Sequence, residues 1–347
     1  MLGMNMGIDL GTSHVRIYVP GRGVVLDEPT VIAVDSKTNA VIACGQEAAA
    51  MLGRTPDSIQ AIQPLSKGVI SEYDYAEQML RIFVRRICAY KVIKPRASVS
   101  IAASVTEVEQ RSIVEAVMAA GIRRVLLIEQ TVAAAIGAGL PISQPNGSMV
   151  VDLGAGTCDV AVLSLKGMVT SLSLRVGGND MDEAIVRYIR NRFNLVIGLP
   201  MAEQIKMQIG RAISQEENPA ALVKGRHAVT GLPVTQEVCA QEIQEAIREP
   251  VREILAAVQR VLETTPPELA GDILSGGITL TGGGALLTGM VDAISRYTGV
   301  DCHMAEDPTT CVAIGTGRAL KYAGVLSSGV YDISQFSYPM SDSSRLE

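Results

Sequence analysis

The sequence predicts an α/β fold made of two similar halves. Predicted strands and helices alternate along most of the chain, which is the pattern of sheets covered by helices. An Asp-Leu-Gly triplet follows an apolar run at Asp9–Gly11, and the same triplet follows another apolar run at Asp152–Gly154. Each triplet leads through a small-residue turn with a Thr into a second apolar run. The chain therefore contains an internal repeat, and two facing halves would enclose one cleft.

The composition of the 347-residue chain fits a globular protein with more than one domain, because chains of this length usually divide. Apolar residues make up 48% and charged residues 19%, which excludes a disordered chain. The net charge of −6 lacks the basic excess of a general nucleic-acid-binding protein. We therefore expect no nucleic acid among its partners.

The six cysteines form no CxxC pair and no Cys/His cluster with zinc spacing. With no secretion signal at the N-terminus, they indicate free thiols in a reducing cytoplasm. No apolar run reaches the ~18 to 20 residues of a transmembrane helix. The sequence therefore predicts a cytoplasmic protein.

Residues 1–145 form the first predicted half, in which short strands come before helices. Apolar runs bounded by Gly and Pro predict strands at 6–11, 15–20, 23–29 and 30–35. A looser pattern follows, and a small subdomain is expected at about 31–69. Thr106 and Glu109 have the spacing of a capping box at a helix start. The later elements are expected as helix 74–89, strand 98–104, helix 106–121, strand 125–129 and helix 131–140.

Residues 146–326 form the second predicted half, which opens on the repeated strand, turn and strand. Its small subdomain is expected at about 182–250. Thr235 is expected to cap a long helix that ends at Thr264 and bends at Pro250, because proline removes a helical hydrogen bond. The other elements are expected as helices 180–193 and 201–213, strands or loop at 227–237, a strand from 277, a last helix at about 313–326 that packs back on the first half, and a polar tail at 327–347.

The repeated turns carry the residue types of a phosphate site. Glycine lets the backbone approach a ligand closely, and backbone N–H groups in such turns can grip phosphate oxygens. Thr12 and Thr157 add hydroxyl donors. Asp9 and Asp152 would repel a bare phosphate, but they suit a Mg²⁺ ion held partly through water. The alternative is two ordinary turns, since Asp, Gly and Thr are common turn residues.

A triple glycine at Gly282–Gly284 lies between a predicted strand and a helix, where it allows a third close approach of the backbone. Together with the duplicated turns it favours a nucleotide cleft. These motifs are similar to those of the MreB/Mbl family, within the superfamily of actin, sugar kinases and heat-shock chaperones. The resemblance covers nearly the whole chain, through segments such as GIDLGT, MLGRTPDSIQAIQPLSKGVI, GSMVVDLGAGT, VGGNDMDEAIVRYIR, IGLPMAEQIKMQIG, LTGGGALL and AEDPTTCVA.

The resemblance implies an actin-like, duplicated ribonuclease H-like fold with a large and a small subdomain in each half. It implies ATP and Mg²⁺ in the central cleft and assembly of the protein with itself into paired protofilaments. It also implies a role in cell shape, exercised with the cell-wall elongation machinery at the inner face of the cell membrane.

The resemblance further implies which residues bind the cofactor. The first turn and then the second would hold the phosphates, a helix of the second half would face the sugar and base, and the triple glycine would close over the adenosine. Glu203 and Lys206 also lie on one helix face, as an ordinary ion pair would. The implied residues are Asp9, Gly11, Thr12, Ser13 and His14, then Asp152, Gly154, Ala155, Gly156 and Thr157, then Glu203, Gln204, Ile205 and Lys206, then Gly282, Gly283, Gly284 and Ala285.

Two positions depart from the family pattern. His14 stands where a small polar residue is usual, and Glu129-Gln130-Thr131 stands where the family usually has Glu-Glu-Pro. The family's second acidic residue positions the attacking water, so the resemblance assigns the catalytic role to Gln130, with Glu129 as the alternative. A Gln can orient water but cannot take its proton, and positioning dominates phosphoryl transfer.

We therefore expect a slow ATPase coupled to polymerisation, and three alternatives stay open. Gln130 could merely cap a buried helix, which would leave a nucleotide-binding filament scaffold with little hydrolysis. A small-molecule kinase of the same superfamily would keep the phosphate turns, but it also needs a carboxylate base beside a substrate hydroxyl, and the sequence offers no convincing one. A chaperone needs a substrate-binding domain that this sequence does not contain.

The segment RRICAYKVIKPR predicts a contact with membrane lipids. Val92 and Ile93 lie between Lys91 and Lys94, with further basic residues on both sides. Apolar residues inside a basic rim suit an anionic lipid surface, and relatives in the family insert a loop here. The alternative is that both residues pack into the core.

Overall fold

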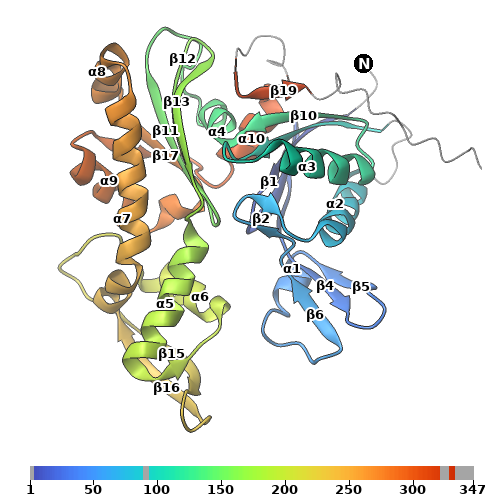
Figure 1. Ribbon diagram of the computed structural model, residues 1–347, viewed down its shortest axis with the longest axis vertical. Helices are drawn as coiled ribbons and strands as arrows, with labels where there is room; N and C mark the ends of the chain where they lie inside the picture. The colour runs from blue at the N-terminus through green and yellow to red at the C-terminus, as the bar shows by residue number, and fades with distance from the viewer. Residues whose placement is uncertain (1–3, 89–93, 321–327, 333–347) are drawn as a thin grey trace, which may run out of the picture.

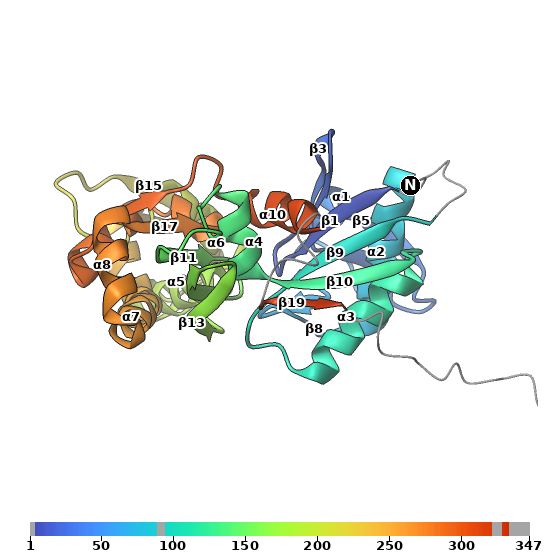
Figure 2. The same cartoon turned by 90° about the horizontal axis from the view of Figure 1, so that it is seen from above.

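The computed structural model describes residues 4–88, 94–320 and 328–332, and it has two α/β halves that lie side by side (Figure 1). Each half is built on one large sheet, and each carries a smaller sheet towards the lower end of Figure 1. Helices α4 (Gln130–Gly137) and α10 (Cys311–Ala319) lie between the two halves when the molecule is seen from above (Figure 2). The α/β class predicted from the sequence is confirmed.

The large sheet of the first half has the strand order β19-β10-β9-β1-β2-β3. Strands β1 to β3 form an antiparallel meander, and β1, β9 and β10 run parallel. Its strands are β1 (Asn5–Leu10), β2 (His14–Val19), β3 (Gly23–Pro29), β9 (Arg96–Ile101), β10 (Arg124–Glu129) and β19 (Val330–Asp332).

Helices α2 (Tyr73–Cys88) and α3 (Glu107–Ala119) bury apolar faces in the same core as this sheet. The capping box predicted before α3 is present. Thr106 N donates to Glu109 Oε2 over 2.7 Å, and Glu109 N donates to Thr106 Oγ1 over 3.3 Å. These two bonds satisfy N–H groups that the first turn of a helix leaves free.

The smaller part of the first half lies between β3 and α2. Its three-stranded sheet has the order β5-β4-β6 and a small apolar core of its own. A two-stranded hairpin then leads into α2. The elements are β4 (Ile32–Asp35), β5 (Val41–Cys44), α1 (Gln46–Ala49), β6 (Ile59–Ile62), β7 (Leu65–Ser66) and β8 (Val69–Ile70).

The large sheet of the second half repeats the plan of the first. Strand β11 (Ser148–Leu153) pairs antiparallel with β12 (Cys158–Ser164) and parallel with β17 (Ile278–Thr281), as β1 does with β2 and β9. The sequence repeat is therefore also a structural repeat. The other elements around this sheet are β13 (Gly167–Leu174), α7 (Ala240–Thr264), α8 (Pro267–Gly276), η1 (Gly283–Leu286), α9 (Met290–Thr298) and β18 (Cys302–Met304).

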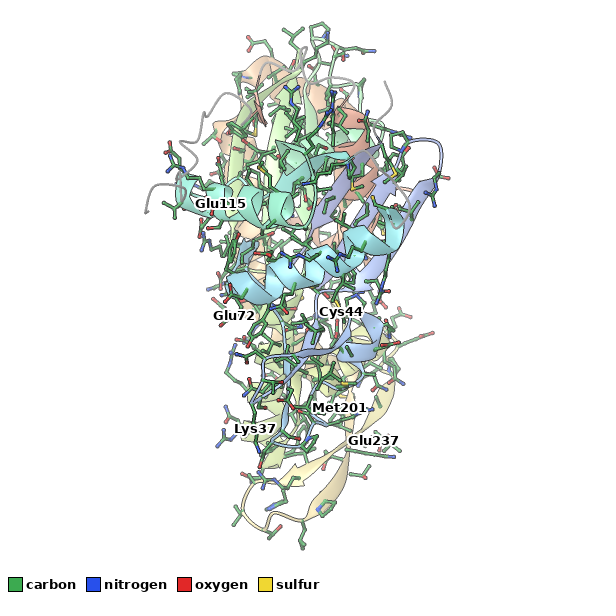
Figure 3. The ribbon with its side chains drawn as sticks, turned by 90° about the vertical axis from the view of Figure 1, so that its right-hand side faces the viewer. Lys37, Cys44, Glu72, Glu115, Met201 and Glu237 are labelled. Atoms are coloured by element: carbon green, nitrogen blue, oxygen red, sulfur yellow. The ribbon has the colours of Figure 1, made fainter. Side chains whose placement is uncertain are left out.

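The smaller part of the second half contains the sheet β14-β15-β16. Its elements are α5 (Gly178–Phe193), β14 (Leu195–Val196), α6 (Leu199–Ile209), β15 (Ala220–His227) and β16 (Pro233–Cys239). Figure 3 shows that Glu237 of β16 lies near the lower end of the molecule, while Glu115 of α3 lies in its upper part. Among the described residues, none of the helices combines the length and the apolar character needed to cross a bilayer.

The contact between α4 and α10 joins the two halves through very close packing. A Cβ on Gly315 would overlap the carbonyl oxygen of Ala133, and one on Gly137 would overlap that of Cys311, so only glycine fits at either crossing. Side chains of α4 and α10 share an apolar core with residues of both large sheets, such as Ile128 and Val150. This core ties the halves together behind the repeated turns.

Two local predictions differ from the structure. Thr235, expected to cap a helix, lies within β16, and α7 begins at Ala240 instead. The reason is that residues 220–239 pair as an antiparallel hairpin, and Thr suits a strand as well as a cap. Val330–Asp332, expected in a polar tail, form β19 on the open edge of β10, where backbone pairing is available to any short extended segment.

Candidate functional site

A cleft of about 390 Å³ opens between the two halves, where the repeated turns face each other. Most of the residues that the resemblance implies lie along it. The cleft is lined by Asp9, Gly11, Thr12, Ser13, His14, Gln130, Asp152, Gly154, Ala155, Gly156, Thr157, Glu203, Lys206, Gly282, Gly283 and Gly284.

The two turns have the same backbone geometry. Gly11 N donates to the carbonyl oxygen of His14 over 3.1 Å, and Gly154 N donates to that of Thr157 over 2.8 Å. Within the described residues, the N–H groups of the residues at the two tips have no hydrogen-bond acceptor; these are Thr12, Ser13, Ala155 and Gly156. Unpaired N–H groups in tight turns are the donors that bind phosphate oxygens. The pair of turns can therefore hold a polyphosphate from both sides.

The tips of the turns also touch each other and the hairpin β7–β8. Thr12 Oγ1 accepts a hydrogen bond of 3.0 Å from Gly68 N. A Cβ on Gly156 would lie 2.5 Å from Thr12 Oγ1, so glycine is needed for this approach. Lys67 Nζ lies 3.3 Å from Asp180 Oδ1 at the start of α5, which links the two halves at this side of the cleft.

Asp9 and Asp152 are buried at equivalent positions of the repeat. Asp9 Oδ1 accepts from Ser100 Oγ over 2.9 Å, and Asp152 Oδ1 accepts from Thr281 Oγ1 over 2.8 Å. Burial raises the pKa of Asp9 to about 6 and that of Asp152 to about 7, because it disfavours the charged carboxylate. A cation beside them would favour the charged forms instead.

These carboxylates fit a Mg²⁺ ion that arrives with a nucleotide. Among the described residues, no group of three His, Cys, Asp or Glu side chains could hold a metal ion alone. Mg²⁺ usually keeps several waters and is bound by one or two carboxylates together with substrate phosphates. Asp9 and Asp152 supply two carboxylates next to the turns, which matches that chemistry.

The raised pKa values predict that the nucleotide-free protein becomes less stable as pH rises. The folded chain holds these two protons more tightly than the unfolded chain, whose aspartates have a pKa near 3.8. The free energy of unfolding therefore falls as pH rises through the window from about 4 to about 7.

Asp152→Asn removes one of the two groups and keeps an oxygen for Thr281. We expect the variant to be more stable than the parent at about pH 8 by roughly 4 kcal/mol, because the pKa of Asp152 rises from 3.8 to about 7 and one pKa unit corresponds to about 1.4 kcal/mol. The difference should shrink towards about pH 4. Thermal unfolding without nucleotide measures it, and parallel pH profiles for the two proteins would contradict the assignment.

His14 lies at the start of β2, where its Nδ1 is 3.1 Å from Ser13 Oγ. Burial and then the positive charge of Arg16 lower the pKa of His14, so the ring is neutral at pH 7. It is therefore a small polar group at the turn rather than a cation. In this respect it resembles the uncharged residue that the family usually has.

The structure distinguishes Gln130 from Glu129. Gln130, the first residue of α4, lines the cleft, and its buried Oε1 has no partner among the described residues. Glu129 does not line the cleft, and its Oε1 accepts a hydrogen bond of 2.8 Å from the hydroxyl of Tyr331. An unpaired buried amide oxygen is unfavourable unless a water or ligand binds it. The side chain able to hold a water in the cleft is therefore Gln130.

The helix α6 presents one face to the cleft. The residues of α6 and its C-cap that line the cleft are Glu203, Lys206, Met207 and Gly210. The last three follow Glu203 by three, four and seven positions, as residues on one side of a helix do. Lys206 Nζ donates to Asp182 Oδ2 and to the carbonyl oxygen of Gly178, both over 2.8 Å. These bonds hold Lys206 at the start of α5.

Three implied residues do not line the cleft, which corrects that part of the assignment. Ile205 is 2% exposed and Ala285 is 4% exposed, and both belong to the apolar core of the second half. Gln204 is exposed to solvent away from the cleft. The reason is helical periodicity, which turns Gln204 and Ile205 away from the face of Glu203. Val92 and Ile93, assigned to a membrane loop, lie outside the described residues.

Several lining residues were not identified from the sequence. Met207 and Gly210 could have been found by helical spacing from Glu203, and Arg16 because it pairs with Asp9 across the first turn. The others lie in loops or in α5, η1 and α10, mostly within segments quoted for the resemblance that were not assigned to the site. They are Gly68, Gly178, Asn179, Met181, Leu286, Leu287, Thr288, Pro308, Thr309 and Val312.

Comparison with known proteins gives consistent matches over nearly the whole chain. The family described as MreB/Mbl protein matches residues 3–328. The cell shape-determining protein Mbl of Bacillus cereus is 44% identical, and the match covers 92% of this chain and 97% of that protein. The cell shape-determining protein MreB of Escherichia coli is 45% identical, with 92% and 94% covered.

Solved structures give the same result for the fold. The crystal structure of Spiroplasma citri MreB5 bound to ADP is 35% identical with a TM-score of 0.87, and the match covers 92% of this chain and 96% of that one. The same protein bound to AMPPNP matches with a TM-score of 0.86. The MamK double helical filament, at 22% identity and a TM-score of 0.79, supports the fold alone. The actin-like fold predicted from the sequence is confirmed.

Proposed function

This chain belongs to the MreB/Mbl family, and from that membership and the cleft we propose that it is an actin-like cytoskeletal protein that binds Mg·ATP and polymerises into filaments. Its role would be to determine cell shape, because its relatives are named cell shape-determining proteins. We propose that it does so by organising cell-wall synthesis, as the sequence resemblance implies. The observation that carries the nucleotide part is the pair of equivalent turns with unpaired N–H groups facing one cleft.

The cleft suggests how each group would act on bound ATP. The N–H groups of the two turns would hold the phosphate oxygens, and the hydroxyls of Thr12 and Thr157 would add donors. Mg²⁺, when bound with the nucleotide, supplies positive charge against the phosphates, and Asp9 and Asp152 would hold its water shell. Gln130 would orient a water toward the terminal phosphate. A relative has been solved bound to ADP and bound to AMPPNP, which supports nucleotide binding by this chain.

Assembly with ATP tests this function. We expect the purified protein to sediment in the presence of ATP and Mg²⁺ and to stay in the supernatant with Mg²⁺ alone, because the nucleotide would set how the two halves are held. Electron microscopy of the pellet should show paired protofilaments. A protein that binds ATP without sedimenting, or that phosphorylates an added small molecule, would contradict a filament-forming function.

We also propose that the protein acts at the inner face of the cell membrane, through Val92 and Ile93. These two residues lie outside the described residues, so the proposal rests on the sequence and on their basic neighbours. Arg85 and Lys94, on either side of the segment, are exposed. Basic side chains near a membrane are attracted to anionic headgroups, and apolar side chains between them can enter the lipid.

Val92→Glu combined with Ile93→Glu is expected to abolish co-sedimentation with vesicles that contain anionic lipid, because charged side chains oppose insertion. The matched control is Leu165→Glu with Val169→Glu, which changes two exposed apolar residues of the second half in the same way. The control should bind vesicles like the parent. Retained binding by the first variant would move the membrane contact elsewhere in the chain.

A further inference from the structure

The β19 segment, residues 328–332, bonds to both halves of the molecule. Its strand pairs antiparallel with β10 of the first half, with Tyr331 opposite Leu127. Its Ser328 Oγ accepts a hydrogen bond of 2.8 Å from Met168 N of β13, in the second half. The segment therefore bridges the halves next to α4.

The β19 segment makes two hydrogen bonds with Glu129, the residue before Gln130. Glu129 N donates to the carbonyl oxygen of Gly329 over 2.9 Å, and the Tyr331 hydroxyl donates to Glu129 Oε1 over 2.8 Å. The other carboxylate oxygen, Glu129 Oε2, is buried and has no partner among the described residues. A buried carboxylate is unfavourable unless it is hydrogen-bonded, so the Tyr331 hydroxyl fixes how this carboxylate lies.

The same segment packs against the first turn of α4. Gly329 has a φ of +75°, and a Cβ on it would lie 2.6 Å from Val132 Cγ2. Glu129 is the N-cap residue of α4 but makes no capping bond with its side chain. The start of this helix is therefore held by the β19 segment rather than by its own cap. Gln130 is the first residue of that helix, and it lines the cleft.

We propose that Tyr331 is a positioning residue for ATP hydrolysis, which holds the Glu129 carboxylate and thereby fixes the start of α4 and the amide of Gln130. Tyr331 does not line the cleft, and the residue is 41% exposed, so it acts through Glu129 and not on the nucleotide. The proposal rests on the proposed function, because it needs a protein that hydrolyses ATP. It gives the β19 segment a role in turnover but none in nucleotide binding.

The test is Tyr331→Phe, which removes one hydroxyl and keeps the ring of a partly exposed residue. We expect phosphate release under filament-forming conditions to fall about fivefold, the equivalent of the ~1 kcal/mol of one hydrogen bond. The affinity for a fluorescent ATP analogue with Mg²⁺ should stay within about twofold of the parent. Tyr297→Phe is the matched control, because Tyr297 lies on α9, is 45% exposed and has no hydroxyl hydrogen bond within the described part of the chain.

A double-mutant cycle separates positioning from general stability. In a Glu129→Ala background, Tyr331→Phe should cause no further loss of phosphate release, because the contact is already gone. An equal loss in both backgrounds, an unchanged Tyr331→Phe, or a loss of nucleotide affinity along with turnover would each overturn the positioning role and leave the proposed function standing. A parent protein that binds Mg·ATP and polymerises but releases no phosphate would overturn both hydrolysis and the role of Tyr331.

Discussion

Replacing Gly283 by Phe is expected to lower the affinity for Mg·ATP by at least about 100-fold, a loss of roughly 3 kcal/mol. Gly283 lines the cleft in η1, and a Cβ built on it meets no atom within 4 Å. The folded protein therefore has room for a side chain there, and that side chain would occupy space that the adenosine needs. Isothermal titration with Mg·ATP measures the effect.

The neighbouring glycines are unsuitable for this experiment. A Cβ on Gly282 would overlap the carbonyl oxygen of Leu153, and one on Gly284 would overlap its side chain, so substitutions there would disturb the fold. Gly271→Phe is a suitable control, because Gly271 is an exposed residue of α8 that also has open space around it. Unchanged ATP affinity in Gly283→Phe would place the adenosine elsewhere.

The second large effect is expected for Gln130→Ala, which should lower phosphate release by about 100-fold while ATP binding persists. The amide would hold the attacking water, and loss of one preorganised group at a reacting atom costs about that factor. Gln130→Glu should match or exceed the parent, because a carboxylate can orient the water and also accept its proton. Phosphate release under filament-forming conditions compares the three proteins.

Glu129→Ala is the control for this assignment. Its carboxylate is bonded to Tyr331 and does not line the cleft, so its removal should lower turnover only about fivefold, the worth of one hydrogen bond. If Glu129→Ala is the inactive protein and Gln130→Ala is active, the catalytic assignment is wrong by one residue. If neither variant changes a very slow phosphate release, the protein is a filament scaffold that hardly hydrolyses ATP.

The site was predictable where sequence motifs coincide with backbone turns. Gly11 and Gly156 stand where a Cβ would come within 2.7 Å and 2.5 Å of a neighbouring oxygen, so the glycines that the motif marks are the ones that close packing requires. The same reasoning fails on a helix, because a contiguous motif such as Glu203–Lys206 includes residues on opposite faces. Ile205 therefore packs into the core, while Met207, outside the motif, lines the cleft.

The fold class was predictable from the alternation of strands and helices. The predicted elements are wrong where a short segment suits more than one type of secondary structure. Thr235 suits both a helix cap and a strand, and pairing with Lys224 across the hairpin decides for the strand. Strand β19 has three residues, which is too short for a periodic pattern, and it exists because β10 offers an open edge. The contact between Tyr331 and Glu129 spans 202 positions, and no single-sequence pattern predicts it.

Near the repeated turns an ion pair joins the two halves, whereas α4 and α10 join them through apolar packing. Lys67 and Asp180 form an ion pair in which the lysine side chain is 50% exposed. Exposed pairs contribute about 0–1 kcal/mol and weaken as dissolved ions screen them, over about 8 Å at physiological ionic strength. The apolar contact of α4 with α10 has no such dependence. Raising the ionic strength is therefore expected to weaken the Lys67–Asp180 contact on one side of the cleft while it leaves the apolar contact between α4 and α10 in place.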